Sequence, residues 1–126
     1  MRQFELEYFV VRYQPNVLHE GFINIGLVMV AIGNADFGDV RFLKNWNPIL
    51  RLDPNADLEL LKDFATDMGE QIRDPEKRVQ MLLLMKSSFS NIIQLSTPRV
   101  CVSDDPPSEL DKLTWQYLPT EANPQD

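Results

Sequence analysis

The sequence predicts an α+β fold, in which a small, mainly antiparallel β-sheet packs against two or three helices. Two observations predict it. Segments rich in aromatic and β-branched residues fill the N-terminal third, and segments with helical periodicity follow from residue 57 onward. The chain has 126 residues, which fits a single domain, expected at residues 1–118. Residues 119–126 have nothing apolar to bury and are expected to form a disordered tail.

Two long strands are expected at Phe4–Tyr13 and Phe22–Ile32. The link between them is short, and a parallel crossover needs about a dozen residues or more, so the two strands should pair antiparallel. By the period of two, the second strand has one uninterrupted apolar face, made of Ile23, Ile25, Leu27 and Met29. Asn24 and Gly26 lie on the other face, where the missing side chain of Gly26 lets another group come close.

The remaining strands are shorter. Residues 33–39, GNADFGD, predict a hairpin turn into a third strand at Val40–Leu43, which a loop through residues 45–48 follows. Ser90–Ser96 is ambiguous, because its polar residues disturb strand alternation. A turn at Thr97 and Pro98 then leads into a strand at Arg99–Val102.

Three helices are expected. Asp57–Ile72 has apolar residues at the spacing of one helical face, and Asp57 or Asn55 can cap its start. A second helix begins at Pro75 and runs to about Ser88; its run MLLLM is apolar nearly all round, so we expect it to be the central buried helix. A final helix follows Pro106 and turns an apolar stripe inward, made of Leu110, Leu113 and Tyr117.

Composition excludes several classes of function. The formal charge is −7, so the basic excess that drives nucleic-acid binding is missing and nucleic-acid binding is unlikely. No apolar run approaches the ~20 residues of a membrane span, and Glu5 and Glu7 interrupt any signal peptide, so we expect a cytoplasmic protein. Cys101 and His19 are single, which rules out an internal disulfide and a zinc site made of Cys and His alone. No cofactor and no metal are expected, and the protein should be a monomer or a homodimer.

One set of polar residues lies where core strands do not need it, and these residues are the candidate binding site: Arg12, Glu20, Asn24, Asn91 and Gln94. Each also has a structural interpretation. Glu20 and Arg12 could form an ion pair, and Asn24 could satisfy backbone groups at a β-bulge beside Gly26. Asn91 and Gln94 could cap the end of the preceding helix. The sequence favours the structural role for Asn24 and leaves the others open.

Weaker candidates have stronger structural interpretations. Cys101 with His19 would be a nucleophile and its base, but Cys101 sits between two valines, which favours a core position. Asp104 and Asp105 could bind a metal with Glu20, although a capping and turn role before a proline is favoured. A small basic patch would use Arg41, Lys44 and Arg51, which are more simply explained as solvated surface charges.

The chain resembles a bacterial family, the domain of unknown function 3037. The segments that carry the resemblance are YFVVRYQPN from residue 8, EGFINIGLVM from residue 20, VRFL from residue 40, DLELL from residue 57, SNIIQLSTPR from residue 90 and ELDKL from residue 109. This chain departs from the family's pattern by Gly21 between Glu20 and the aromatic Phe22. The resemblance supplies no substrate, but it implies a possible partner, because genes for HipA-type kinases often neighbour those of the family.

These observations predict a cytoplasmic accessory or interaction protein that acts through a protein partner, with a HipA-like kinase as one candidate. The alternative is a small enzyme or ligand-binding domain that uses the five-residue polar set. A pocket lined by several of these residues would favour the alternative, and an exposed apolar patch would favour the interaction protein.

Overall fold

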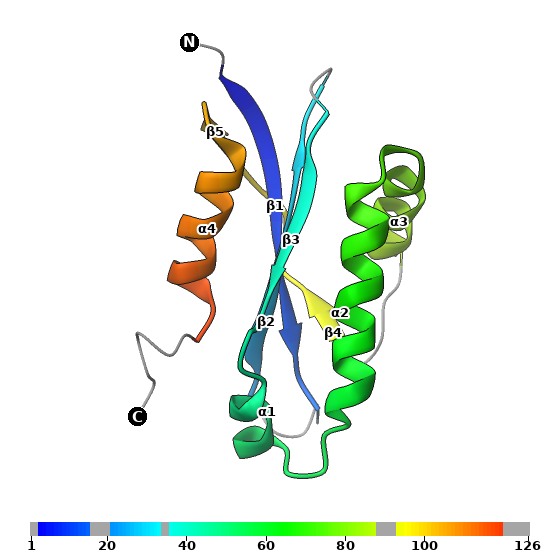
Figure 1. Ribbon diagram of the computed structural model, residues 1–126, viewed down its shortest axis with the longest axis vertical. Helices are drawn as coiled ribbons and strands as arrows, with labels where there is room; N and C mark the ends of the chain where they lie inside the picture. The colour runs from blue at the N-terminus through cyan, green and yellow to red at the C-terminus, as the bar shows by residue number, and fades with distance from the viewer. Residues whose placement is uncertain (1–2, 16–20, 34–35, 88–92, 120–126) are drawn as a thin grey trace.

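The computed structural model describes residues 3–15, 21–33, 36–87 and 93–119. Five strands form one sheet: β1 (Phe4–Tyr13), β2 (Ile23–Ala31), β3 (Gly38–Phe42), β4 (Ile93–Leu95) and β5 (Arg99–Ser103). Their order is β3-β2-β1-β4, with β5 also paired to β1, and every pairing is antiparallel (Figure 1). The predicted α+β class and the antiparallel pairing of the first two strands are confirmed.

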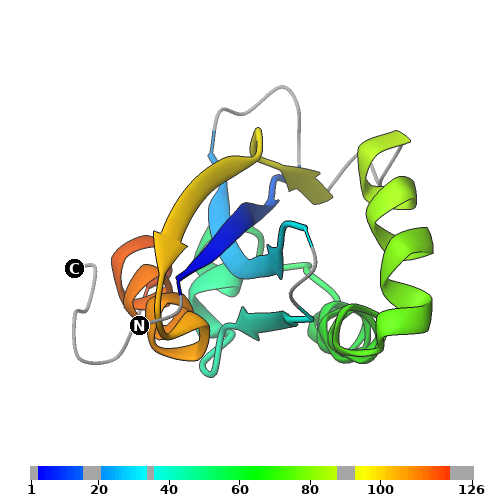
Figure 2. The ribbon, with the colours of Figure 1, turned by 90° about the horizontal axis from the view of Figure 1, so that it is seen from above.

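Helices cover both faces of the sheet. They are α1 (Asn47–Leu52), α2 (Leu58–Arg73), α3 (Pro75–Ser87) and α4 (Pro106–Tyr117). Figure 2 shows α2 and α3 on one side of the sheet and α4 on the other. Among the described residues, none of these helices has the length and apolar character that crossing a membrane requires.

The core is split into two clusters by the sheet. On one face, residues such as Phe9 and Val28 pack with Met68 and Ile72 of α2. On the other face, Leu6, Tyr8, Val10, Leu27 and Met29 pack with Leu110 and Leu113 of α4. Strand β1 lies inside the sheet, and its middle, residues 8–11, buries side chains on both faces, which is why this part is continuously apolar while the start of the strand alternates.

A β-bulge in β2 overturns the prediction of one uninterrupted apolar face. The pairing passes from Val11 opposite Gly26 to Arg12 opposite Asn24, so β2 uses one extra residue, Ile25. The extra residue reverses the alternation of side chains. Ile23 and Ile25 therefore belong to the cluster under α2, and Leu27 and Met29 to the cluster under α4. The close approach expected at Gly26 is confirmed, because the Phe42 ring occupies the space where a Cβ would lie.

The helix α3 is not the central buried helix, and that prediction is wrong. Met85 is only 5% exposed, but Leu83 is 62% exposed and Val79 is 61% exposed. One side of α3 packs beside α2, whereas Val79 and Leu83 on its far side are exposed to solvent. The apolar run shows only that the helix can be buried; it does not supply a neighbour for each face.

The helix caps, two short elements and the C-terminal tail can also be compared with the predictions from the sequence. Asp57 caps α2 and Asp105 caps α4, as expected, because each carboxylate accepts a hydrogen bond from the backbone N–H three residues on. The segment expected as a loop after the third strand contains α1, whose Ile49 is fully buried. The ambiguous segment contains the short strand β4. The tail predicted at 119–126 lies, from residue 120 onward, outside the described residues.

Candidate functional site

Three of the five candidate residues form one row across the sheet. Arg12 of β1 lies opposite Asn24 of β2 on one side and opposite Gln94 of β4 on the other. Residues directly opposite each other on neighbouring strands have Cβ atoms about 4.5–5.5 Å apart and point to the same face. The row therefore brings together residues that are up to 82 positions apart in sequence. Glu20 and Asn91 lie outside the described residues, so the complete set of five stays a prediction.

Asn24 is held by two hydrogen bonds. Its side-chain amide donates to the backbone carbonyl of Tyr117 at 3.0 Å, and its Oδ1 accepts from Arg12 Nε at 3.3 Å. Tyr117 is the last residue of α4, where helix carbonyls have no intrahelical partner. The bulge at Ile25 turns Asn24 toward α4, and Asn24 then ties the end of α4 to the sheet. The sequence favours a structural role for Asn24, but the backbone carbonyl that it bonds belongs to the end of α4 and not to the bulge beside Gly26.

Arg12 is less fully occupied. Its guanidinium lies 5.1 Å from the centre of the Phe22 ring, which is half exposed. Within the described part of the chain, Nε is the only nitrogen of this guanidinium that donates a hydrogen bond, and no carboxylate pairs with it. A guanidinium stacked on an aromatic ring with two free nitrogens can bind a carboxylate or another anion in a bidentate way. Glu20 is one candidate for that carboxylate.

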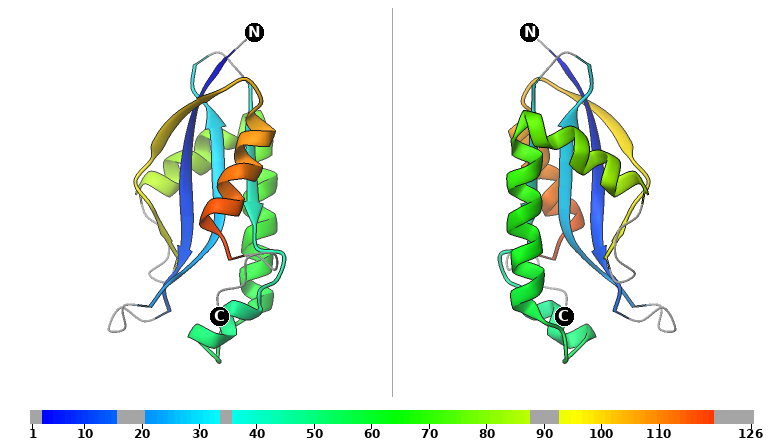
Figure 3. Two further views of the ribbon diagram at one scale, coloured as in Figure 1. Left: turned by 90° about the vertical axis from the view of Figure 1, so that its left-hand side faces the viewer. Right: turned by 90° about the vertical axis from the view of Figure 1, so that its right-hand side faces the viewer.

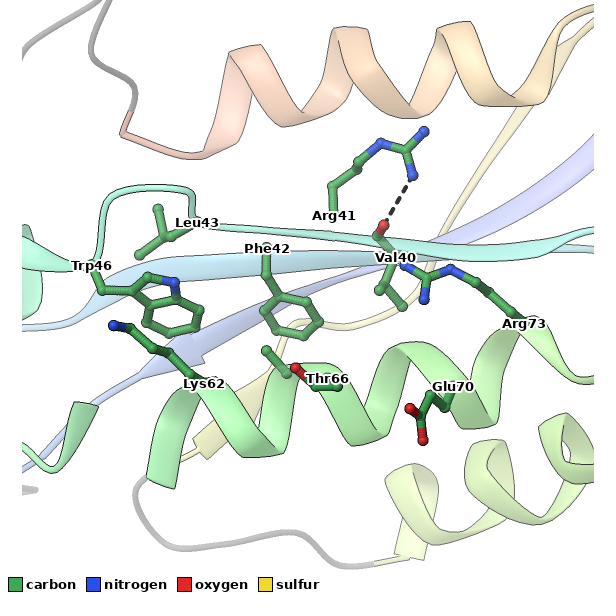
Figure 4. Close-up of a pocket in the computed structure, with 10 residues that line it drawn as sticks. Val40, Arg41, Phe42, Leu43, Trp46, Lys62, Thr66, Glu70 and Arg73 are labelled. Atoms are coloured by element: carbon green, nitrogen blue, oxygen red, sulfur yellow. Dashed lines mark hydrogen bonds between the residues drawn. The ribbon is translucent and has the colours of Figure 1, made fainter. Parts of the chain in front are cut away.

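A separate hollow of about 530 Å³ lies between β3 and α2. In Figure 4 the rings of Phe42 and Trp46 lie between the strand and the helix, while Arg41 points to the other side, toward α4. The exposed side chains of α2 that border this hollow include Lys62 and Glu70. None of the five candidate residues lines it. The sequence does not reveal this hollow, because it predicts the strand and the helix as separate elements and does not indicate that they lie beside each other.

A chain of ion pairs runs around the β3 edge beside this hollow. Asp39 accepts a hydrogen bond from Arg73 of α2 at 2.7 Å and one from Arg41 at 2.7 Å, and Arg41 also donates to Asp111 of α4 at 2.8 Å. We call these four residues the edge clamp. Burial acts to raise the pKa of Asp39, but hydrogen bonds from Arg41, Arg73 and the Val40 N–H outweigh it and lower the pKa. The charge of Arg41 is therefore compensated within the fold, which removes it from the candidate basic patch.

The weaker candidates have structural positions. Cys101 is partly buried against the α4 cluster, and burial together with the nearby carboxylate of Glu109 raises the pKa of its thiol, so the reactive thiolate is disfavoured. Its suggested partner, His19, lies outside the described residues. Asp105 caps α4. Within the described ranges, no group of three or more His, Cys, Asp or Glu side chains could hold a metal ion.

Comparison with known proteins identifies a family. The model of a family described as "Protein of unknown function (DUF3037)" matches residues 8–118. The match covers most of the chain, from β1 to the end of α4. Comparisons with curated proteins and with solved structures gave no match.

Proposed function

Since the chain belongs to the family described as a protein of unknown function, DUF3037, we propose its function from its own surface. We infer that it is a cytoplasmic accessory protein that acts by docking on a protein partner, and that the contact is the outer face of α3. We define this outer face by Val79 and Leu83, with Leu84 at its border.

The exposed apolar residues of α3 carry the proposal. Val79 is 61% exposed, Leu83 is 62% exposed and Leu84 is 51% exposed. Val79 and Leu83 are four residues apart and therefore neighbours on one helix surface. Leu83 lies on the side opposite Met81 and Met85, which pack inward. A cluster of large apolar side chains on one helix is a signature of a protein contact, whereas single exposed apolar residues are normal.

An apolar helix face of this kind suits helix-in-groove recognition, in which side chains at i and i+4 enter a hydrophobic groove. The net charge of −7 favours a partner whose groove has a basic border, because opposite charges speed the encounter. The family resemblance makes a HipA-like kinase the first partner to test.

One observation favours the alternative, a small enzyme or ligand-binding domain. Arg12 has two guanidinium nitrogens without a hydrogen bond among the described residues, and Asn24 and Gln94 flank it. Together with Glu20 and Asn91 they would form an anion or carboxylate site on the sheet. The interaction protein is preferred because large apolar side chains of α3 are exposed to solvent, which a protein contact would explain.

The test is affinity purification of the tagged full chain from its native host, with Leu83→Glu as the variant and Leu60→Glu as the matched control. Leu60 is 58% exposed on α2, so it tests a new charge at an equally exposed apolar position outside α3. We expect one partner, identified by mass spectrometry, to bind the wild type and the control and to be lost with Leu83→Glu. The purified pair should then bind in isothermal titration calorimetry, with the same loss. A partner retained by Leu83→Glu, or lost equally with both variants, would contradict the proposed contact.

A further inference from the structure

The sheet has two edges, and the edge at β3 is blocked at its centre, Val40. Backbone groups on a strand point alternately to its two neighbours. The Leu43 N–H donates to the Ile25 carbonyl, and the Phe37 carbonyl accepts from the Ala31 N–H. Odd-numbered residues in this part of the chain therefore direct their backbone groups toward β2, and Val40 directs its own outward. The Val40 N–H donates to the carboxylate of Asp39 at 2.8 Å, and its carbonyl accepts from Arg41 at 3.0 Å. The edge clamp therefore satisfies the outward groups of Val40, which blocks the addition of a further strand.

The edge at β5 is different. The Glu5 carbonyl accepts a hydrogen bond from the Ile32 N–H, so the backbone groups of Glu5 point toward β2. Those of the next residue, Leu6, therefore point toward β5, where Leu6 lies opposite Cys101. Cys101 then directs its backbone groups to β1, and its neighbours Val100 and Val102 direct theirs away from the sheet. Among the described residues, no side chain bonds these outward groups as Asp39 and Arg41 do at Val40. The two valines thus offer two N–H donors and two carbonyl acceptors.

The side chains on β5 leave this edge accessible. Val100 is 65% exposed and Val102 is 54% exposed. The helix α4 follows β5 but packs over β1, β2 and β3. The left view of Figure 3 shows β5 at the margin of the sheet. Natural proteins protect free edges with charged side chains, prolines or bulges, and the three central residues of β5, Val100, Cys101 and Val102, include neither a charge nor a proline.

We propose that the β5 edge pairs with the β5 edge of a second copy of this chain, antiparallel and centred on Cys101. In this register Val100 of one copy lies opposite Val102 of the other, and each pair exchanges two backbone hydrogen bonds. The arrangement is two-fold symmetric, as a closed homodimer requires, and it joins two sheets into one. Cys101 faces its own copy across the axis.

Charge selects this pairing over a parallel one. The strand begins with Arg99 and is followed by Asp104 and Asp105. Antiparallel self-pairing places the basic start of each copy beside the acidic end of the other, twice per dimer. A parallel arrangement would place like charges together. A strand of five residues makes a small contact, and interfaces that bury less than about 1,200 Å² are typical of weak, transient association.

The experiment is sedimentation velocity of the full chain over a range of concentrations, combined with amide exchange measured by NMR at the two ends of that range. We expect a monomer–dimer equilibrium. Exchange at the Val100 and Val102 amides should slow as the dimer forms, whereas the Cys101 amide, already bonded to β1, should change little. Val100→Lys, and independently Val102→Lys, should weaken dimerisation by about 100-fold or more, because each dimer then carries two lysines next to the contact.

Val79→Lys is the matched control, because Val79 is as exposed as Val100 but lies on α3. It should leave the dimer intact and keep this test separate from the proposed α3 contact. If the chain stays monomeric at the highest concentration, the inference is overturned. It is also overturned if Val79→Lys dissociates the dimer while Val100→Lys and Val102→Lys leave it intact. Slow exchange at Val100 and Val102 at every concentration would assign the edge to another segment of the same chain and would also overturn it.

Discussion

Replacing Asp39 by asparagine tests the edge clamp most directly. Asp39 is a charged acceptor for two arginines, and its side chain is only 22% exposed. The bond to Arg41, which is 29% exposed, should contribute about 1.5–3 kcal/mol as a charge-assisted hydrogen bond. Arg73 is 55% exposed, so its bond is screened by solvent and should contribute at most about 0.5 kcal/mol. Asparagine keeps an acceptor for the Val40 N–H. We therefore expect Asp39→Asn to lower the free energy of unfolding by about 2–3 kcal/mol at pH 7.

The same change predicts a dependence on pH. The pKa of Asp39 is lowered by folding from its ordinary value of 3.8. Its charge therefore stabilises the fold fully above the unfolded pKa, and this stabilisation is lost as the pH falls through the folded pKa. Asparagine does not titrate, so the difference between wild type and variant should be constant above about pH 5 and should shrink below 3.8.

Urea unfolding followed by circular dichroism, repeated from neutral pH to about pH 2.5, measures both effects. Asp111→Asn is the control, because the Asp111 side chain is 68% exposed and should contribute little. A loss below about 0.5 kcal/mol for Asp39→Asn, or a loss that stays the same at low pH, would refute the reasoning.

Three further predictions concern other parts of the fold. Asn24→Ala removes the side-chain bond to the end of α4 and should cost about 1–3 kcal/mol in urea unfolding; a variant of unchanged stability that loses ligand or partner binding would instead support a site. Met85→Ala should cost about 2–5 kcal/mol, and Leu83→Ala less than about 1 kcal/mol; equal losses would show that α3 buries its far side. Burial and the hydrogen bond to Asp53 raise the pKa of Tyr13 to about 12, so ultraviolet titration of the Tyr13→Phe variant should lose the phenolate transition of Tyr13 near pH 12. Wild-type stability should fall as the pH rises above about 10, because the Tyr13 phenol ionises first in the unfolded chain.

Local chemistry made part of this fold predictable. The antiparallel pair of β1 and β2 follows from two β-rich segments and a link too short for a crossover. The caps of α2 and α4 follow from Asp57 and Asp105 alone, because a short carboxylate before a helix accepts a free N–H. The bulge between Asn24 and Gly26 was suggested by the sequence, but the bond from Asn24 to the end of α4 was not, because these two positions are far apart in the chain.

Other features could not be predicted, because they depend on contacts between distant segments. The edge clamp joins Asp39 to Arg73 and Arg41 to Asp111, pairs 34 and 70 positions apart. No periodicity relates such residues. The exposure of Leu83 has the same origin, because a helix that is apolar all round can be buried only where neighbours cover each face. The five-residue polar set shows the same limit. Strand register brings Arg12, Asn24 and Gln94 together, although the sequence alone does not give that register. Glu20 and Asn91 lie outside the described residues.

The two proposed contacts lie on different elements and do not compete. The outer face of α3 contains Val79 and Leu83, whereas the dimer uses the backbone edge at Val100 and Val102. A dimer formed through β5 would carry two α3 faces. If both contacts form, a dimeric or surface-bound partner would be held by two α3 faces at once, and its apparent affinity would exceed that of one face by an amount set by the effective concentration. Val100→Lys should then weaken binding to a dimeric partner without changing the affinity of the single α3 contact. Leu83→Glu should abolish the single α3 contact and, with it, binding to the dimeric partner. The pair of variants therefore separates the contribution of dimerisation from that of the α3 surface.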